Sequence, residues 1–137
     1  MYPESIQRYH RLLKRDPKNA DLVNNYAYTL LESGDAKNAE IAFRRAVELK
    51  PGFENAATNL GMMLGRQQRY AEALEILLPV IGESAAHHNI GVVAVESGDR
   101  LAAIQHFEKA ASLPNSSKLT HEFLAKLKTS AEDQLTK

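Results

Sequence analysis

Residues 20–51 read ADLVNNYAYTLLESGDAKNAEIAFRRAVELKP. Apolar residues recur at helical spacing on both sides of Gly34-Asp35. Glycine readily takes the left-handed conformation that ends a helix, and aspartate accepts hydrogen bonds from the N–H groups that open the next one. Pro51 cannot continue a helix. The stretch therefore predicts two amphipathic helices joined by a tight turn.

Small residues in this stretch occupy positions where the two helices can approach closely. They are Ala27, Ala39 and Ala46. The bulky residues expected to fill the remaining space between the helices are Tyr26, Leu30, Phe43 and Val47.

The unit recurs along the chain with a period close to 34 residues. A shift of 34 from Ala27, Leu30, Ala39 and Phe43 gives Gly61, Leu64, Ala73 and Leu77, and a further shift of 30 gives Gly91, Ala94, Ala103 and Phe107. The turn Glu32-Ser33-Gly34-Asp35 returns as Glu96-Ser97-Gly98-Asp99. A backward shift of 34 from the second half of the unit finds Ser5, Tyr9, Leu12 and Pro17. A fixed period of helix–turn–helix units is typical of a helical solenoid.

The small–bulky pattern and the proline near the end of the unit resemble the tetratricopeptide repeat (TPR) family, although tryptophan is absent and Tyr26 stands where the family usually has leucine. The resemblance implies an all-α fold, a right-handed α-solenoid of antiparallel helix pairs, in one domain spanning residues 1–137. The expected parts are a half repeat at 3–17, repeats at 20–51, 53–83 and 84–115, and a capping helix at 117–135. The second repeat is shortened by four residues, about one helical turn.

Composition limits the classes of function. The 137 residues are 44% hydrophobic and carry 17 basic and 17 acidic side chains, with no cysteine. A balanced charge does not favour nucleic-acid binding, and no apolar run is long enough for membrane insertion. We expect a cytoplasmic protein. Because the sequence begins almost inside a half repeat, the chain is expected to be a fragment, and a periplasmic location is possible if its targeting segment is missing.

Local signals set the expected helix ends. The expected helices are 3–15, 20–33, 36–49, 53–66, 69–81, 84–97, 100–113 and 117–135. Asn19, Ser84 and a serine before the last helix are predicted to cap helices, Gly82 to end one, and Pro79 to kink one. The last helix is predicted to use an apolar stripe of Leu119, Phe123, Leu127, Ala131 and Leu135. The first helix has a basic side, Arg8, Arg11, Lys14 and Arg15, interpreted as a solvated face or as a contact with upstream repeats.

The sequence contains no catalytic constellation, phosphate-binding loop or HExxH motif, so we expect no enzyme activity and no cofactor. His87 and His88 are adjacent and point about 100° apart around a helix. His10, His106 and His121 lie on other helices without ligand spacing, so no metal site is predicted.

One polar position recurs on the first helix of each repeat. Asn25, Asn59 and Asn89 are equivalent in three successive repeats. A carboxamide offers a donor and an acceptor, so it can hold the N–H and C=O of an extended peptide. The arrangement is similar to the asparagine ladder in the TPR superhelix of O-linked N-acetylglucosamine transferases. The alternative is that each asparagine bonds a neighbouring helix.

Other residues are expected beside this ladder on the concave surface: Asn24, Tyr28, Thr58, Met62, Arg66, His88 and Val92. Tyr28 and Met62 offer apolar contact, and Arg66 can meet a carboxylate. The dicarboxylate clamp of chaperone-binding TPR proteins is disfavoured. Of the corresponding residues Asn24, Tyr28, Asn59, Ala85 and Asn89, only Asn59 matches it.

The leading functional hypothesis is a non-enzymatic protein–protein interaction module that binds an extended or helical partner segment in its concave groove. Two alternatives stay open. The chain can serve as an assembly or self-association scaffold, as in bacterial pilus and secretion systems, or as the substrate-recruiting arm of a larger enzyme. Its expected partners are thus a protein or peptide, or a second copy of itself.

Overall fold

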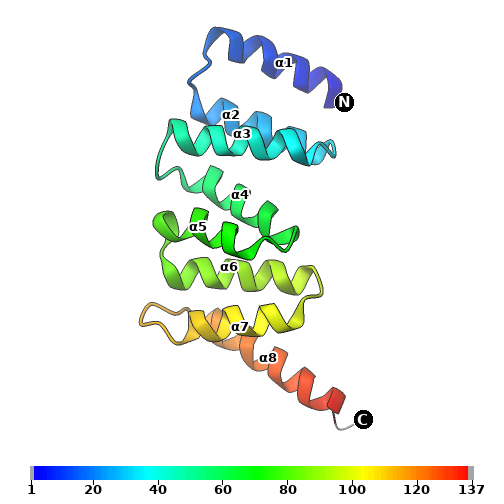
Figure 1. Ribbon diagram of the computed structural model, residues 1–137, viewed down its shortest axis with the longest axis vertical. Coiled ribbons are helices and arrows are strands. Elements are labelled where there is room, and N and C mark those ends of the chain that lie inside the picture. The colour runs from blue at the N-terminus through cyan, green and yellow to red at the C-terminus, as the bar shows by residue number, and fades with distance from the viewer. Residues whose placement is uncertain (1, 136–137) are drawn as a thin grey trace. The chain divides into compact units, whose positions relative to one another are not determined.

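The computed structural model describes residues 2–135, with side chains described as far as residue 130 (Figure 1). These residues form eight helices and no strand: α1 Tyr2–Arg15, α2 Ala20–Glu32, α3 Ala36–Leu49, α4 Glu54–Arg66, α5 Tyr70–Ile81, α6 Glu83–Glu96, α7 Arg100–Ala111 and α8 Lys118–Leu135. The all-α class is confirmed. Each expected helix end lies within two residues of the observed one.

The chain forms two compact units, Met1–Met63 and Leu64–Lys137, with the boundary inside α4. The N-terminal unit holds α1, α2, α3 and most of α4. The C-terminal unit holds the last residues of α4 and the helices α5 to α8. Both units are built from the same kind of helix pair.

In the N-terminal unit, α2 and α3 form the expected pair (Figure 1). Gly34 has φ +92°, which is the left-handed conformation that the turn requires. The Asp35 carboxylate accepts a hydrogen bond of 3.2 Å from the backbone N–H of Asn38 and opens α3, while Asn19 caps α2 in the same way. Among the residues expected between the two helices, Tyr26 and Val47 are only half-buried, and the others are buried: Ala27, Leu30, Ala39, Phe43 and Ala46.

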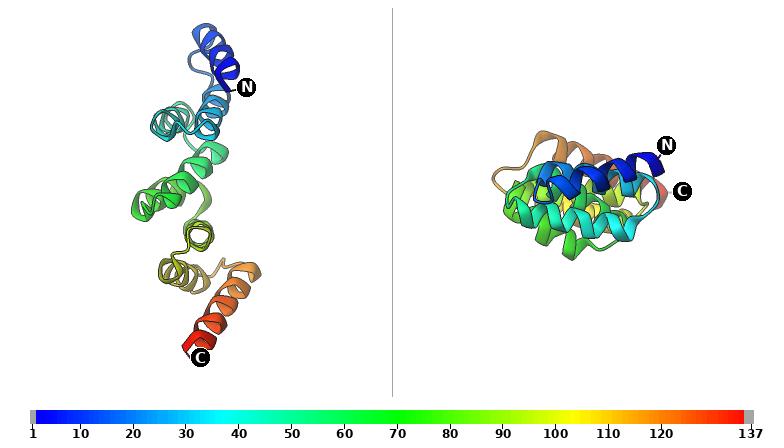
Figure 2. Two further views of the ribbon diagram at one scale, coloured as in Figure 1. Left: turned by 90° about the vertical axis from the view of Figure 1, so that its right-hand side faces the viewer. Right: turned by 90° about the horizontal axis from the view of Figure 1, so that it is seen from above.

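In the C-terminal unit, α6 and α7 repeat this arrangement and are seen nearly end on in the left view of Figure 2. Gly98 has φ +76°, and the Asp99 carboxylate caps α7 at the N–H of Ala102. The core of the pair contains Phe107 with Ala94 and Ala103. Three residues of α8 pack against this core: Phe123, Leu124 and Leu127.

One expected helix cap is wrong. The sequence predicts Ser84 as the cap of the helix after Gly82, but α6 already begins at Glu83. Gly82, at φ +87°, ends α5 and precedes α6 directly, so Ser84 lies inside α6. Its buried hydroxyl instead donates a 3.1 Å hydrogen bond to the carbonyl of Ala110 on α7. Ser84 therefore ties the two helices of the pair together.

The expected apolar stripe of α8 is correct in part. Phe123 and Leu127 pack on the core, but Leu119 is 51% exposed. The neighbouring Thr120 is buried instead, and its hydroxyl lies 2.7 Å from His88 Nδ1 on α6. Ser117 caps α8 by accepting a hydrogen bond from the N–H of Thr120. The side chains of Ala131 and Leu135 lie outside the described residues.

Pro79 lies inside α5, which the structure assigns as one helix from Tyr70 to Ile81. A kink at this proline remains a prediction. The side chain is exposed, so its ring displaces no core residue.

A substitution at Gly91 tests whether α6 and α7 must approach closely. A Cβ at this position would lie 2.8 Å from the Phe107 ring, closer than side chains tolerate. We expect Gly91→Ala to lower the free energy of unfolding by about 1–2 kcal/mol, because overpacking outweighs the gain in helix propensity. Urea unfolding followed by circular dichroism measures it.

The control is the double variant Gly91→Ala/Phe107→Leu, in which the smaller side chain frees space for the new methyl group. The double variant should lose less stability than the sum of its two single variants. Strictly additive losses would contradict the proposed steric clash.

Candidate functional site

In the N-terminal unit, two of the three recurring asparagines lie on α2 and α4. Asn25 is exposed and Asn59 is half-buried. Asn59 Nδ2 donates a 3.2 Å hydrogen bond to Oδ1 of Asn24, which is only 7% exposed. Asn24 is therefore a supporting residue beneath Asn59 and offers little surface of its own.

The bond to Asn24 leaves Asn59 able to bind further groups. A carboxamide has two N–H donors and a carbonyl oxygen with two acceptor sites. One donor of Asn59 is used by Asn24, so one donor and the oxygen remain. The contact fixes the orientation of the side chain, which reduces the entropy that a bound partner has to remove.

Apolar side chains accompany these asparagines at matching repeat positions. Tyr28 on α2 is 48% exposed, and its equivalent Met62 on α4 is half-buried. Thr58, the α4 equivalent of Asn24, is also half-buried. The N-terminal unit thus offers a mixed surface of amide groups and accessible apolar atoms.

In the C-terminal unit, three of the other candidate residues, Arg66, His88 and Val92, have partners within the unit. The Arg66 guanidinium lies 3.6 Å from a carboxylate oxygen of Glu96. Asn89, the third recurring asparagine, is half-buried. His88 Nδ1 lies 2.7 Å from the Thr120 hydroxyl on α8, and Val92 packs on the Phe107 core. His88 is therefore used in holding α8, and Val92 is used in the core of the α6–α7 pair.

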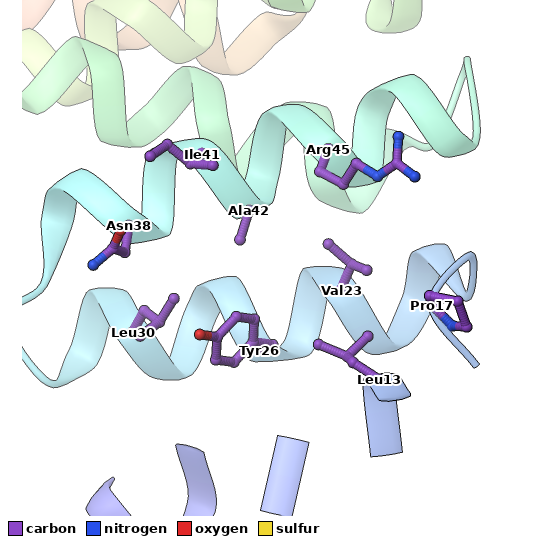
Figure 3. A pocket seen from close by; sticks show the side chains of 9 residues that line it. All are labelled: Leu13, Pro17, Val23, Tyr26, Leu30, Asn38, Ile41, Ala42 and Arg45. Carbon is purple, nitrogen blue, oxygen red and sulfur yellow. The ribbon is translucent and has the colours of Figure 1, made fainter. Parts of the chain in front are cut away.

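The N-terminal unit also contains an apolar cavity that the sequence did not indicate. It has a volume of about 310 Å³ and lies among α1, α2 and α3 (Figure 3). Val23 of α2 and Ala42 of α3 point toward the space between these helices (Figure 3). The full lining is Leu13, Pro17, Val23, Tyr26, Leu30, Asn38, Ile41, Ala42 and Arg45.

The C-terminal unit holds a histidine pair that was not expected. The Nδ1 atoms of His87 on α6 and His106 on α7 lie 2.9 Å apart, and the rings stack at 5.2 Å. Only one proton fits between two nitrogens at this distance, so one ring donates and the other accepts, and the bond is lost only when both rings are protonated. Tyr70 packs on the ring of His106 and donates from its hydroxyl to Asp99.

The surroundings of this pair shift several pKa values. Burial lowers the pKa of His87, and burial together with the neighbouring His87 lowers the pKa of His106. Glu83 and Asp99 oppose these shifts, while Lys109 adds to the shift of His87. Burial also lowers the pKa of His88, and burial with the Asp99 hydrogen bond raises the pKa of Tyr70 to about 12.

A repeat-based signal for the pair was present in the sequence. Subtracting 64 residues from His87 and His106 gives Val23 and Ala42, which are both buried and face one another in the N-terminal unit. Residues at these two repeat positions meet across the helix pair. The histidines are therefore core substitutions, and no group of three metal-ligating side chains occurs among the described residues.

Comparison with known families settles the fold assignment. Tetratricopeptide repeat models match residues 2–52, 55–81 and 84–116. The chain belongs to the tetratricopeptide repeat family. Membership of this family supports a protein–protein interaction module. Across the described part of the TPR chain, no helix has the length and hydropathy needed to cross a membrane.

Two curated relatives share part of the TPR chain. A stretch of 83 residues is 28% identical to Protein O-mannosyl-transferase Tmtc3 of Drosophila melanogaster and covers 61% of this chain and 9% of that protein. A stretch of 74 residues is 28% identical to the Hsp70-Hsp90 organizing protein of Triticum aestivum and covers 54% of this chain and 13% of that protein. The TPR chain thus spans about a tenth of the length of these relatives.

Solved structures show the same fold. MamA from Desulfovibrio magneticus RS-1 is similar with a TM-score of 0.65 at 18% identity, over 98% of this chain and 78% of that chain. YrrB, described as a TPR protein with an unusual peptide-binding site, has a TM-score of 0.62 at 25% identity, over 89% and 65% of the two chains. The expected fold class, a TPR solenoid of helix pairs, is confirmed.

The histidines predict a pH dependence of stability. Their folded-state pKa values lie below the unfolded value of about 6.5, so the unfolded chain binds more protons on acidification. The free energy of unfolding should be level above about pH 7 and fall as the pH drops below about 6.5. Urea unfolding at several pH values down to about 5.5 measures this before most carboxylates titrate.

The double variant His87→Gln/His106→Gln should flatten this dependence, whereas His121→Gln, at an exposed position on α8, should preserve it. If the free energy of unfolding of the double variant and of the wild-type chain fell in parallel on acidification, the His87–His106 pair would be excluded as the main source of the pH dependence.

Proposed function

We propose that this chain is a non-enzymatic interaction module that binds an extended or helical segment of a partner protein along the first helices of its repeats. The observation that supports this most directly is the hydrogen bond between the side-chain amides of Asn24 on α2 and Asn59 on α4. Asn59 is held in place by Asn24 and keeps one donor and its oxygen for a ligand. Asn25 is exposed at the equivalent position of the preceding repeat.

The chemistry of this surface favours recognition of a peptide backbone. Amide side chains at a repeat spacing can bond successive N–H and C=O groups without depending on the partner's side chains. The exposed ring of Tyr28 and the half-buried Met62 supply apolar contact for one or two partner side chains. Such a short contact suggests an affinity in the micromolar range, about −8 kcal/mol.

The surface does not favour the C-terminal carboxylate of a chaperone as the ligand. Tyr28 and Ala85 stand at two positions where the dicarboxylate clamp has polar or charged residues. Arg66, the remaining cation among the candidates, already faces Glu96. Similarity to the Hsp70-Hsp90 organizing protein therefore supports a protein-interaction role only.

A peptide array provides the ligand for testing this proposal. Peptides selected by the wild-type chain are resynthesised, and their affinity is measured by fluorescence anisotropy. Asn25→Ala/Asn59→Ala should weaken binding about tenfold, as expected for the loss of two hydrogen-bonding groups. Asn115→Ala, which removes an exposed amide from a loop of the C-terminal unit, serves as the matched control.

Backbone recognition has a second readout. Methylating single peptide nitrogens should weaken binding at alternate positions even where side-chain substitutions are tolerated, because an extended chain directs alternate N–H groups to one side. Full affinity in the double asparagine variant would refute the proposed role of these amides.

A second candidate function is the substrate-recruiting arm of a larger enzyme. It is favoured by the similarity to part of Tmtc3, whose name describes a transferase and whose length far exceeds the matched segment. In that case the surface that carries Asn25 and Asn59 would bind the enzyme's protein substrate. The full reading frame around these residues tests it: an adjoining catalytic domain is expected, and its absence would remove this candidate.

A further inference from the structure

The cavity among α1, α2 and α3 lies where two facing positions of the first repeat carry small side chains. Val23 on α2 and Ala42 on α3 line it, and both are buried (Figure 3). A hollow of about 310 Å³ leaves the surrounding side chains without packing partners, which lowers stability. The same volume is within the range of sites that bind a ligand group.

The C-terminal unit shows what can occupy the equivalent place. Adding 64 residues to Val23 and Ala42 gives His87 and His106, whose rings stack at 5.2 Å. The ring of Tyr70 packs on His106 at 5.6 Å. These rings belong to α5, α6 and α7, which correspond to α1, α2 and α3. The repeat pattern therefore fills this place with aromatic rings of the three helices, and does not assign it to a helix that precedes α1.

A cation stands at the edge of both places. Arg45 lines the cavity, and its repeat equivalent is Lys109. Lys109 Nζ lies 3.7 Å from a carboxylate oxygen of Glu83 on α6. The first repeat has Asn19 at the position of Glu83, and the side-chain oxygen of Asn19 caps α2. The carboxylate that faces the cation in the third repeat thus has no counterpart in the first.

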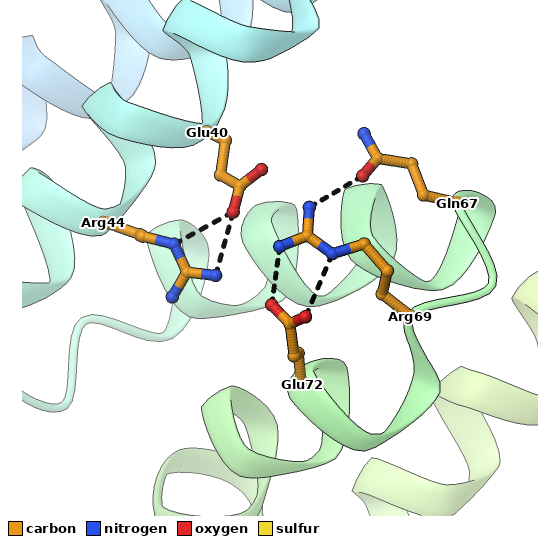
Figure 4. Close-up of polar contacts among 5 residues, drawn as sticks. All are labelled: Glu40, Arg44, Gln67, Arg69 and Glu72. Atoms are coloured by element: carbon orange, nitrogen blue, oxygen red, sulfur yellow. Dashed lines mark hydrogen bonds and ion pairs between the residues drawn. The ribbon is translucent and has the colours of Figure 1, made fainter.

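Arg45 has a weak ion pair of its own. Among the described residues it pairs with Glu48 alone, at 3.9 Å, and both side chains are more than half exposed. Such a pair contributes little, because water screens it. The neighbouring Arg44 is held more closely, at 2.9 Å from Glu40 (Figure 4). Arg45 therefore keeps guanidinium donors for a further carboxylate.

We propose that this cavity docks a segment of a partner protein that inserts a bulky apolar side chain, best an aromatic one, and presents a carboxylate to Arg45. The third repeat supplies both groups from within the chain, as the stacked rings and Glu83. The first repeat has neither. The site is separate from the amide surface, since Asn25 and Asn59 do not line it.

The surroundings of the cavity fit a polypeptide. Ile41 and Pro17 line it and are exposed, Ile41 by 59%, so the apolar surface extends beyond the hollow. Residues next to the anchoring side chain gain contact there. Asn38 donates a 2.7 Å hydrogen bond to Asp35, which leaves its side-chain oxygen able to accept from a backbone N–H of the partner.

Nuclear magnetic resonance titration of the isotope-labelled full chain tests the proposal. The probe is a capped extended peptide of about nine residues, with glycine and serine around a central Glu-Phe-Glu, so that a carboxylate lies beside the ring in either direction of binding. The control peptides carry Gln-Phe-Gln or Glu-Ser-Glu. We expect Glu-Phe-Glu to shift the backbone signals of Ile41 and Ala42 with a dissociation constant of about 1 mM or below. Gln-Phe-Gln should bind about threefold and Glu-Ser-Glu at least about tenfold more weakly.

Filling the cavity gives a second test. Ala42→Ile introduces the side chain that the second repeat has at this position, Ile76. It should weaken binding of Glu-Phe-Glu at least about tenfold and raise the melting temperature by about 2–4 °C, because the added methyl groups pack in the hollow. The two changes have opposite signs, so unfolding cannot explain the loss of binding. Ala71→Ile, at an exposed position of α5, is the matched control and should leave the affinity within about twofold.

The charge contact is tested separately. Arg45→Gln should weaken binding of Glu-Phe-Glu about threefold and leave that of Gln-Phe-Gln unchanged. Lys109→Gln removes the equivalent cation of the C-terminal unit and should change neither. Asn25→Ala/Asn59→Ala should also leave binding of these peptides unchanged, which distinguishes this site from the surface of the proposed function.

Several outcomes would overturn the proposal. Unshifted signals of Ile41 and Ala42 with about 5 mM Glu-Phe-Glu, or equal binding of Glu-Ser-Glu, would exclude an anchoring side chain. Phenylacetate binding as tightly as the peptide would assign the cavity to a small apolar acid. A concentration-dependent dimer in sedimentation that Ala42→Ile abolishes would assign it to a second copy of this chain.

Discussion

Close packing of a bulky residue of the second helix against a small residue of the first is the constraint on which each helix pair depends. Phe107 leaves no room for even one methyl group on Gly91. At the same repeat positions of the N-terminal unit, Phe43 and Ala27 are both fully buried. Because the pair can close only in this register, the positions on its outer surfaces are free to carry polar groups.

The two units use this freedom differently. In the N-terminal unit, Asn59 is oriented by Asn24 beside an accessible Tyr28, so the surface remains available to a ligand. In the C-terminal unit, His88 contacts Thr120 of α8, Val92 packs on the Phe107 core, and His87 pairs with His106 across the helix pair. The first unit is therefore the better candidate for partner binding, while the second contains histidines whose pKa values burial lowers.

The repeat period was sufficient to predict the helix pairs, their turns and most of their core, because Gly34 and Asp35 act locally. Contacts between residues far apart in the sequence were harder to predict. Nothing near Ser84 in the sequence indicates its bond to Ala110, and the pairing of His87 with His106 required mapping both onto Val23 and Ala42. The amide position was predicted from recurrence alone, but the support that Asn24 gives to Asn59 depends on the packing of α2 and α4.

Nuclear magnetic resonance of the asparagine side-chain NH₂ groups tests the central claim most directly. A peptide ligand is titrated into the labelled chain and each amide signal is followed. We predict that the signals of Asn25 and Asn59 shift on binding, whereas that of Asn115 stays in place. Shifts confined to the second helices, with Asn25 and Asn59 unchanged at saturation, would contradict the claim that these amides bind the partner.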